Sequence, residues 1–381
     1  MGVLKWVGLG ALGVIVLGAA GVGIGLAATG TSPPPSGSIS AERIGAGPYA
    51  VGRADMDWVD ASRPTPANGD YAGSDERVLP TLIWYPEHFD GSSPLVIYSH
   101  GFLSNREGGD YLAEHLASHG YVVASTNFPL SNGAAPGGAT IEDVPSQPGD
   151  VHFLIDQVLA LGGDDKPFAS TIDAERIGAM GLSLGGLTTT LATFHPEWRD
   201  PRIKAAVSMA GPVDVFGPGF FEHSDAPYLS ISGTEDAIVA HRTNAEPIPS
   251  RVRDGGLLEI DGGTHVGFVG MSSGPMRLLG NPDAMACAAA DFSWDGHPFA
   301  GKYGDASDGL LIPEEYVGAC TRDLGETISS GRQQQIAKLA VRAFFEATFA
   351  ESAAERQAAE TFVTAQLPEE FPELRYLAAE R

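Results

Sequence analysis

Short hydrophobic runs alternate with longer amphipathic stretches along most of the chain. The short runs are bounded by Gly, Pro or polar residues, which is typical of β-strands buried on both faces. They cover residues 78–85, 94–99, 121–125, 176–180, 203–209, 228–232 and 256–260. The amphipathic stretches repeat their apolar positions with a helical period and cover residues 107–119, 150–161, 184–195 and 333–350. This rhythm predicts an α/β fold with a mostly parallel central sheet and helices on both faces.

The N-terminal segment, residues 1–30, does not follow this pattern. Lys5 precedes an apolar run, residues 6–28, that carries no charge and is long enough to span a membrane as a helix. We predict an uncleaved signal anchor, with a cleaved signal peptide as the alternative. The main domain is therefore expected outside the cytoplasm, either membrane-anchored or secreted. A Pro-rich linker, residues 31–40, precedes this domain, residues 41–381.

The composition is that of a folded, acidic protein. The 381-residue chain carries 23 basic and 48 acidic side chains, for a net charge of −25, and 43% of its residues are hydrophobic. A field of this sign repels phosphate backbones and anionic lipid surfaces, so nucleic acid is not expected as a partner. The charge identifies no substrate, because an acidic surface also serves solubility alone.

Ser183 lies at the centre of the sequence Gly-Leu-Ser-Leu-Gly, residues 181–185, between a predicted strand and a predicted helix. In that context the pattern GxSxG predicts a sharp turn that exposes the serine hydroxyl. Gly181 and Gly185 leave room for the neighbouring backbone. The N–H group of Leu184, at the start of the helix, points at a developing oxyanion. We therefore interpret Ser183 as a nucleophile rather than an ordinary turn serine.

A serine nucleophile in this chain order is followed by an acid and then by a histidine. His265 lies just beyond the predicted strand 256–260 and is the predicted base. Asp236 follows the predicted strand 228–232 and is the predicted acid, while Asp214, which follows the strand before, is the alternative. Either aspartate also fits a plain turn-capping role. The other histidines that follow this serine turn, which we call the elbow, are His195, His223, His241 and His297.

The second oxyanion donor is expected in the loop after an early strand. The sequence Ser-His-Gly-Phe-Leu, residues 99–103, occupies that position after the predicted strand 94–99. The N–H group of Phe102 is the candidate, with Leu103 as the alternative. We expect His100 to pack under the loop rather than to act as a second base.

An irregular segment, residues 271–327, is rich in Gly, Pro, Asp and Ala and breaks the alternating pattern. We interpret it as an insertion that either covers the site as a lid or decorates the surface. Both cysteines of the chain, Cys287 and Cys320, lie in it. Export would allow them to form a disulfide, and two reduced thiols are the alternative. The chain has no CxxC pair, which excludes a zinc ribbon.

Four segments of the chain resemble a known family. They are residues 83–86 (IWYP), 94–101 (PLVIYSHG), 116–124 (LASHGYVVA) and 177–186 (IGAMGLSLGG). In that order they resemble the dienelactone-hydrolase-like and platelet-activating-factor-acetylhydrolase-like branch of the α/β hydrolases, over about residues 45–270. Bacterial cutinase-like polyester hydrolases are similar through the elbow and through residues 233–236.

The resemblance implies an α/β-hydrolase fold and a Ser-Asp-His triad that cleaves carboxylic esters without a metal or organic cofactor. On this chain the triad falls on Ser183, Asp236 and His265. In the acetylhydrolase branch the acid follows the earlier strand, which keeps Asp214 open. True dienelactone hydrolases use a cysteine nucleophile, so the serine argues against that reaction.

We therefore expect a serine hydrolase that cleaves a small-molecule or lipid-like ester through an acyl-enzyme. A peptidase or acyltransferase with the same triad is one alternative, because the acceptor depends on the shape of the pocket. A non-catalytic, membrane-tethered binding protein on a hydrolase core is another. The sequence names neither the ester nor the oligomeric state.

Overall fold

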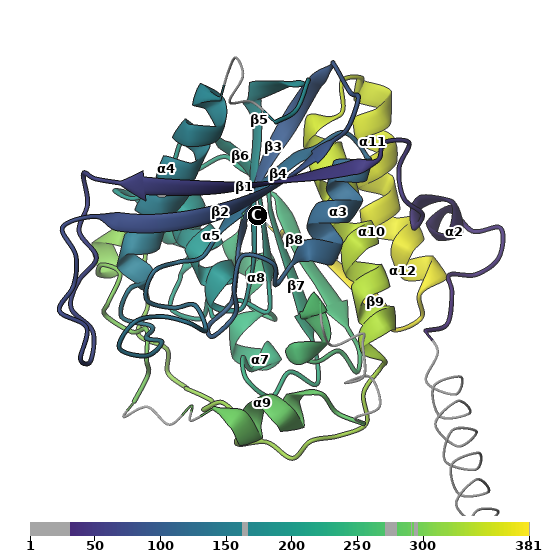
Figure 1. Ribbon diagram of the computed structural model, residues 1–381. Coiled ribbons are helices and arrows are strands. Elements are labelled where there is room, and N and C mark those ends of the chain that lie inside the picture. Colours follow the sequence, from purple (N-terminus) through teal and green to yellow (C-terminus); the bar gives the residue numbers. More distant parts are fainter. Residues whose placement is uncertain (1–30, 162–166, 271–279, 291, 293–295, 381) are drawn as a thin grey trace, which may run out of the picture.

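A single sheet organises the molecule (Figure 1). The computed structural model describes residues 31–161, 167–270, 280–290, 292 and 296–380. In this part of the chain nine strands follow the order β1-β2-β4-β3-β5-β6-β7-β8-β9. They are β1 (Val51–Asp60), β2 (Arg77–Pro86), β3 (Ser92–Ser99), β4 (Val122–Thr126), β5 (Thr171–Leu182), β6 (Ile203–Met209), β7 (Tyr228–Gly233), β8 (Gly255–Ile260) and β9 (Leu374–Ala378).

The central strands β4, β3, β5, β6, β7 and β8 run parallel, whereas β1, β2 and β9 pair antiparallel with their neighbours. Every strand expected from a hydrophobic run is present, and the predicted mostly parallel α/β sheet is confirmed. The hydrophobic pattern misses the two edge strands. In β1 three of the four exposed positions hold Arg53, Asp55 and Asp57, and β9 buries only Leu374, so neither strand forms a continuous apolar run.

Helices cover both faces of the sheet (Figure 1). On one face α4 (Gln147–Ala160) packs against α5 (Leu184–Phe194). On the other face α3 (Asp110–Ser118) packs against α10 (Ser330–Phe349), which is followed by α11 (Ala353–Thr361) and α12 (Leu367–Glu370). The short helices are α6 (Pro218–Phe221), α7 (His241–Asn244), α8 (Ile248–Arg251) and α9 (Asp283–Ala289), and the tighter or wider turns are η1 (Val144–Ser146), η3 (Val266–Phe268), η6 (Ala306–Asp308) and η7 (Phe362–Gln366).

The central strand β3 shows how the core is divided. Successive side chains of a strand point to opposite faces of the sheet. Val96 and Tyr98 are therefore buried in the cluster that contains the α3 and α10 side chains, and Leu95 and Ile97 in the cluster that contains those of α4. The run of apolar side chains from Leu95 to Tyr98 is explained by burial on both faces.

The N-terminal part of the described chain is attached to the domain. The short helix α2 (Ile39–Arg43) begins two residues before the predicted domain start at residue 41. The Glu370 carboxylate accepts hydrogen bonds from the N–H groups of Ile39, at 2.9 Å, and Ser40, at 2.8 Å.

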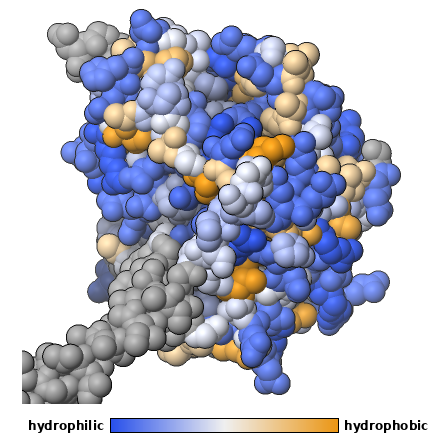
Figure 2. Space-filling view, turned by 90° about the vertical axis from the view of Figure 1, so that its right-hand side faces the viewer, coloured by the Kyte–Doolittle hydropathy of each residue, from blue (hydrophilic) through white to orange (hydrophobic). Residues whose placement is uncertain are grey.

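On the face to the right in Figure 1, hydrophobic residues form small separate groups among hydrophilic ones (Figure 2).

The predicted signal anchor or signal peptide, residues 1–30, lies outside the described residues. Among the residues that the structure describes, none of the helices combines the length and the apolar character needed to cross a membrane.

Candidate active site

Ser183 occupies the turn between β5 and α5, as the sequence pattern predicts. Its backbone angles, φ 56° and ψ −123°, lie in a strained region for a residue with a side chain. Its N–H group donates to the carbonyl of Met209 at 2.8 Å, which ties the turn to β6. A Cβ atom on Gly181 would lie 2.1 Å from the Gly185 carbonyl oxygen, and one on Gly185 would lie 1.9 Å from that of Ser99. Glycine is therefore required at both positions by close packing of the backbone.

His265 and Asp236, the predicted base and acid, are in contact. The His265 Nδ1 atom lies 2.9 Å from Asp236 Oδ2, and Asp236 is completely buried. The other oxygen, Asp236 Oδ1, accepts hydrogen bonds from the N–H groups of Ile238, at 2.9 Å, and Val239, at 2.7 Å. These two N–H groups fix the orientation of the carboxylate, which in turn fixes the imidazole.

The contact with Asp236 also sets the protonation of His265. A carboxylate oxygen accepts, so Nδ1 carries the proton and Nε2 keeps a lone pair. Burial lowers the pKa of His265, but the charge and hydrogen bond of Asp236, together with the charge of Asp283, outweigh burial and raise the pKa above its ordinary value of 6.5. The result is a neutral ring at alkaline pH that gains a proton readily.

This pKa leads to a prediction for the pH dependence of the activity. His265 must be neutral to accept a proton, so kcat/KM is expected to fall on the acid side with a midpoint above 6.5, since the pKa is raised. Initial rates measured between about pH 5 and about pH 9 at constant ionic strength would give this midpoint. A midpoint at or below the ordinary histidine value would contradict the role of the Asp236 charge.

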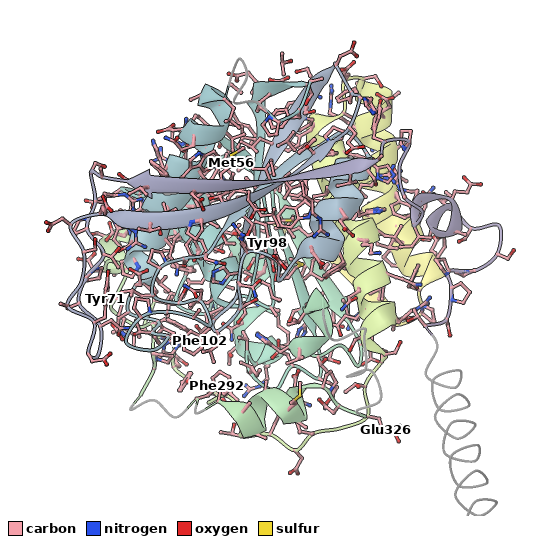
Figure 3. The ribbon with its side chains drawn as sticks, viewed as in Figure 1. Met56, Tyr71, Tyr98, Phe102, Phe292 and Glu326 are labelled. Atoms are coloured by element: carbon pink, nitrogen blue, oxygen red, sulfur yellow. A yellow bond between two sulfur atoms is a disulfide. The ribbon has the colours of Figure 1, made fainter. Side chains whose placement is uncertain are left out.

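Ser183 and His265 line the same cavity, together with Phe102 and Phe292. Within the described part of the chain, no hydrogen bond joins the Ser183 hydroxyl to the His265 ring. Such bonds are often long in ligand-free enzymes and tighten when substrate binds. Phe102, from the loop after β3, and Phe292, beyond α9, lie at the lower side of the domain, where the parallel strands end (Figure 3).

The backbone N–H groups around Ser183 fit an oxyanion site. Among the described residues, the N–H groups of Phe102 and Leu184 have no hydrogen-bond partner, and Leu184 is the first residue of α5. The N–H group of Leu103, the alternative donor, instead donates to the Ser131 carbonyl at 2.9 Å. The geometry therefore favours Phe102 over Leu103.

His100 holds the loop that carries Phe102. Its Nδ1–H group donates to the Gly101 carbonyl at 2.8 Å, and its Nε2 accepts from the N–H group of Phe128 at 3.1 Å. Burial lowers the pKa of His100 to about 4. Both ring nitrogens are engaged and the ring is neutral near pH 7, in keeping with the predicted packing role.

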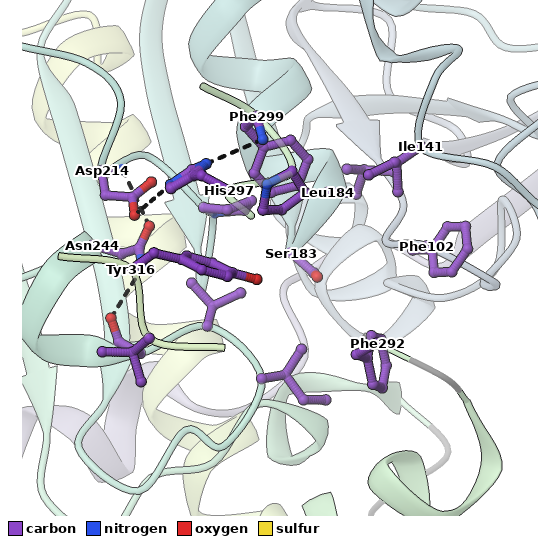
Figure 4. Close-up of a pocket in the computed structure, with 16 residues that line it drawn as sticks. Phe102, Ile141, Ser183, Leu184, Asp214, Asn244, Phe292, His297, Phe299 and Tyr316 are labelled. Atoms are coloured by element: carbon purple, nitrogen blue, oxygen red, sulfur yellow. Dashed lines mark hydrogen bonds and ion pairs between the residues drawn. The ribbon is translucent and has the colours of Figure 1, made fainter. Parts of the chain in front are cut away.

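Asp214, the alternative acid, contacts a different histidine. Its Oδ2 lies 3.0 Å from His297 Nε2 (Figure 4). His297 Nδ1 accepts hydrogen bonds from the N–H groups of Phe299 and Ala300, each at 3.1 Å. His297 Nε2 must therefore carry the proton, and the ring has no free lone pair with which to act as a base.

Two other histidines after the elbow have both ring nitrogens engaged. His195 Nε2 donates to the Tyr303 carbonyl at 3.0 Å, and His195 Nδ1 accepts from backbone N–H groups at the end of α5. His241 contacts Ser232 Oγ and Glu259 Oε2, each at 3.0 Å. His265 differs from both, because among the described residues only its Nδ1 has a hydrogen-bond partner.

Asp283, which the sequence pattern does not single out, joins two loops. One follows β7 and carries Asp236 (the acid loop), and the other follows β8 and carries His265 (the base loop). Asp283 is fully buried at the start of α9, inside the predicted insertion. Its Oδ2 accepts from the N–H groups of Ala237, at 2.9 Å, and His265, at 3.1 Å, and its Oδ1 accepts from that of Val266 at 2.7 Å. One carboxylate therefore fixes the backbone beside both members of the His–Asp pair.

The insertion holds the acid loop at further points. Cys287 and Cys320 are joined by a disulfide, with 5.6 Å between their Cα atoms. The N–H group of Cys320 donates to the Ala237 carbonyl at 2.6 Å. Arg322 donates to the Thr234 carbonyl and to the Glu235 carboxylate, each at 2.7 Å. The disulfide thus ties α9, which carries Asp283, to the segment with Cys320 and Arg322 that contacts the acid loop.

Replacing Asp283 with asparagine is expected to lower stability by about 1 to 3 kcal/mol, because an amide NH₂ group would face a backbone N–H group. Loss of the negative charge should also shift the acid limb of kcat/KM to lower pH, since Asp283 raises the pKa of His265. Asp323→Asn removes the same charge from an exposed position of the insertion and is the control. An unchanged pH profile in Asp283→Asn would contradict its coupling to His265.

The strand order and a serine on the turn between β5 and α5 define the class of α/β hydrolases. Residues 67–276, more than half of the chain, match the model of the PETase family, described as PET hydrolase-like. The chain therefore belongs to the PET hydrolase-like family. The predicted resemblance to cutinase-like polyester hydrolases is confirmed at this level. The match ends before α9, so Asp283 and the disulfide lie beyond it.

Curated relatives agree with this assignment. The chain is 25% identical over 256 residues to cutinase cut1 of Thermobifida fusca, a match that covers 63% of the chain and 71% of the cutinase. It is 32% identical over 120 residues to the putative esterase YitV of Bacillus subtilis, covering 31% of the chain and 44% of that protein. It is 31% identical over 148 residues to the 20-hydroxy-prefusarin hydrolase FUS2 of Gibberella moniliformis, covering 36% of the chain and 32% of that protein.

The chain thus spans less than half the length of two of these relatives and most of the length of the cutinase. Family and relatives together identify a carboxylic ester hydrolase.

Proposed function

We propose that the protein cleaves carboxylic esters through an acyl-enzyme on Ser183, with His265 as base and Asp236 as acid. The observation that supports this most strongly is the contact between His265 Nδ1 and the buried Asp236, which leaves Nε2 as the accepting atom beside the cavity that Ser183 lines. A base oriented by a carboxylate and facing a serine is what nucleophilic acyl transfer requires.

In the first half of the reaction the Ser183 hydroxyl attacks the ester carbonyl while His265 Nε2 takes its proton. The negative charge that develops on the carbonyl oxygen is stabilised by the N–H groups of Phe102 and Leu184. His265 then donates its proton to the departing alkoxide, and the alcohol leaves. In the second half water attacks the acyl-enzyme by the same path, and Ser183 regains its hydroxyl proton.

Two cavities meet at Ser183 and divide the substrate between them. The larger of the two includes His265. The smaller one is lined by Leu184, Asp214 and His297 and lacks His265. Because His265 protonates the leaving alcohol, the alcohol part belongs in the cavity that contains it. We name that one the leaving-group cavity and the smaller one the acyl pocket.

The insertion takes part in the acyl pocket. Its described residues His297, Phe299 and Tyr316 line the wall opposite Phe102 and Ile141 (Figure 4). This supports a role for the insertion in substrate binding rather than in surface decoration. The cutinases and esterases among the relatives favour esters as substrates of this chain as well. A panel of small-molecule and polymeric esters distinguishes the two kinds of substrate.

We further propose that the enzyme is exported. The apolar run in residues 6–28 supports a signal anchor or signal peptide, and the disulfide between Cys287 and Cys320 fits an oxidising compartment. In this organisation residues 31–40 link the anchor to the catalytic domain.

A fluorophosphonate probe tests the proposed chemistry directly. The probe should label the protein in proportion to its loss of p-nitrophenyl butyrate hydrolysis, and peptide mapping should place the label on Ser183. Heat-denatured protein, which lacks the ordered base, is the control. A label on another serine, or full activity after complete labelling, would contradict the mechanism. Product analysis with added alcohols or amines distinguishes a hydrolase from an acyltransferase.

A further inference from the structure

Among the described residues that line the acyl pocket, one carries a carboxylate, and most of the others are apolar. Its lining includes Phe102, Leu184 and Phe299, and the acidic side chain is that of Asp214 (Figure 4). Asp214 is only 5% exposed. The proposed mechanism makes no use of Asp214, because Asp236 already occupies the position beside His265. A buried carboxylate that lines the same cavity as the nucleophile therefore needs another explanation.

The Asp214 carboxylate has fewer hydrogen bonds than it can accept. Its Oδ2 receives one, from His297 Nε2 at 3.0 Å. Its Oδ1 is buried and, within the described residues, has no hydrogen-bond partner. A carboxylate has about four acceptor positions, and leaving them unfilled in a dry environment costs free energy. Asp214 lines the pocket, so a ligand that enters it can supply the hydrogen-bond donor that the carboxylate lacks.

The surrounding residues hold the carboxylate in place. The Asn244 Oδ1 atom accepts from the N–H groups of Val213, at 2.8 Å, and Asp214, at 3.1 Å. His297 is held in turn by two backbone N–H groups on its Nδ1, and the ring of Tyr316 packs against it with 4.8 Å between centroids. A polar group fixed in this way is organised before the ligand arrives, which is typical of a specificity site.

The charge balance favours a neutral donor over a cation. Arg251 donates to the backbone carbonyls of Val213 and Asp214, at 3.2 and 3.3 Å, and its guanidinium interacts electrostatically with Asp214. Burial lowers the pKa of Arg251, and the Asp214 charge opposes that change. Arg251 thus places a positive charge near Asp214 from the protein side, which makes a neutral hydroxyl donor a better partner than a second cation.

We propose that the acyl part of the substrate carries a hydroxyl group that donates a hydrogen bond to the Asp214 carboxylate, so that the enzyme prefers hydroxyacyl esters. The proposal rests on the proposed function, because the mechanism assigns this pocket to the acyl group. His297 and Tyr316 lie beyond residues 67–276, so half of the hydroxyl site comes from outside the segment that matches the family.

The wild-type enzyme alone provides a direct test. Ethyl pentanoate is compared with the set of isomeric ethyl hydroxypentanoates, which carry one hydroxyl at successive carbons of the acyl chain, and hydrolysis is followed by titration of released acid. At least one hydroxylated isomer is expected to have a kcat/KM about 10- to 100-fold above that of ethyl pentanoate, which is the value of a hydrogen bond to a charged group. If every isomer is cleaved no faster than ethyl pentanoate, the hydroxyl site is wrong. A preference for the matching aminoacyl esters would also overturn it.

Variants connect the preference to Asp214. Asp214→Leu removes the acceptor at similar volume, and the ratio of hydroxylated to plain ester should fall to about one. Asp214→Asn keeps an oxygen for the His297 Nε2–H group and places its NH₂ group where Oδ1 was, so a substrate hydroxyl can only accept a neutral hydrogen bond there. The ratio should therefore be intermediate. Val317→Ala alters the apolar wall while leaving Asp214 in place, and is expected to keep the wild-type ratio. Equal ratios in wild type and Asp214→Leu would contradict the assignment.

The outcomes separate this proposal from the mechanism on which it depends. Thermal unfolding and fluorophosphonate labelling of each variant establish that the fold and the Ser183 site are intact. If ethyl pentanoate is hydrolysed but the hydroxylated esters show no advantage, only the hydroxyl site fails. If the fluorophosphonate probe labels the wild-type enzyme but no ester in the panel is hydrolysed, the proposed function itself fails.

Discussion

Replacement of Ser183 by alanine is expected to lower kcat for p-nitrophenyl butyrate by about 10⁵- to 10⁶-fold, the loss typical of a missing serine nucleophile. Alanine has no hydroxyl to attack the ester, while the N–H groups of Phe102 and Leu184, the proposed oxyanion donors, are left in place. Release of p-nitrophenol at saturating substrate gives kcat directly. Circular dichroism and thermal unfolding should show a folded variant, because alanine fits the space of serine.

Ser104→Ala is the matched control for this experiment. Ser104 lines the leaving-group cavity together with Ser183 but lies in the loop after β3. Its loss should change kcat less than about tenfold, as for a side chain outside the reacting group. Comparable losses in Ser104→Ala and Ser183→Ala, or full activity in the latter, would refute Ser183 as the nucleophile.

The second large effect is expected for Asp236→Asn, which should lower kcat by about 10⁴-fold. The N–H groups of Ile238 and Val239 both donate to Asp236 Oδ1, so the oxygen of an asparagine must take that position. Its NH₂ group then faces His265 Nδ1 and forces that atom to accept. The proton moves to Nε2, and the ring can no longer take the proton of Ser183.

Asp214→Asn is the comparison that discriminates between the two candidate acids. Asp214 contacts His297 rather than His265, so its replacement leaves the His265 tautomer unchanged. On a plain ester such as p-nitrophenyl butyrate its loss of kcat should be at least about 100-fold smaller than that of Asp236→Asn. A larger loss in Asp214→Asn would make Asp214 the triad acid.

Much of the fold and of the site geometry follows from local sequence signals. The elbow combines a short motif with a strand before it and a helix after it, and these signals are contiguous in the chain. Asp236 and His265 are far apart in sequence, yet both follow predicted parallel strands. Since the carboxyl ends of such strands meet at one edge of the sheet, their contact could be anticipated from topology.

The residues that escaped prediction lie where no periodic pattern exists. Asp283 and His297 belong to the irregular insertion, and their roles arise from contacts with loops that are distant in sequence. Nothing in the neighbouring residues marks Asp283 as buried or His297 as a partner of Asp214. The strand β1 escaped for a different reason, because an edge strand with charged outer positions has no continuous apolar run.

The three hydrogen bonds of Asp283 have a consequence for anyone who redesigns this enzyme. On the loop side they use only main-chain N–H groups, so substitutions at Ala237 or Val266 would leave them in place. On the insertion side they depend on one side chain. A shortened enzyme that lacks α9 and the disulfide would keep Ser183, Asp236 and His265 but lose the brace between the last two. Trimming for a smaller enzyme should therefore retain Asp283 and the Cys287–Cys320 disulfide, or supply a new link between the two loops.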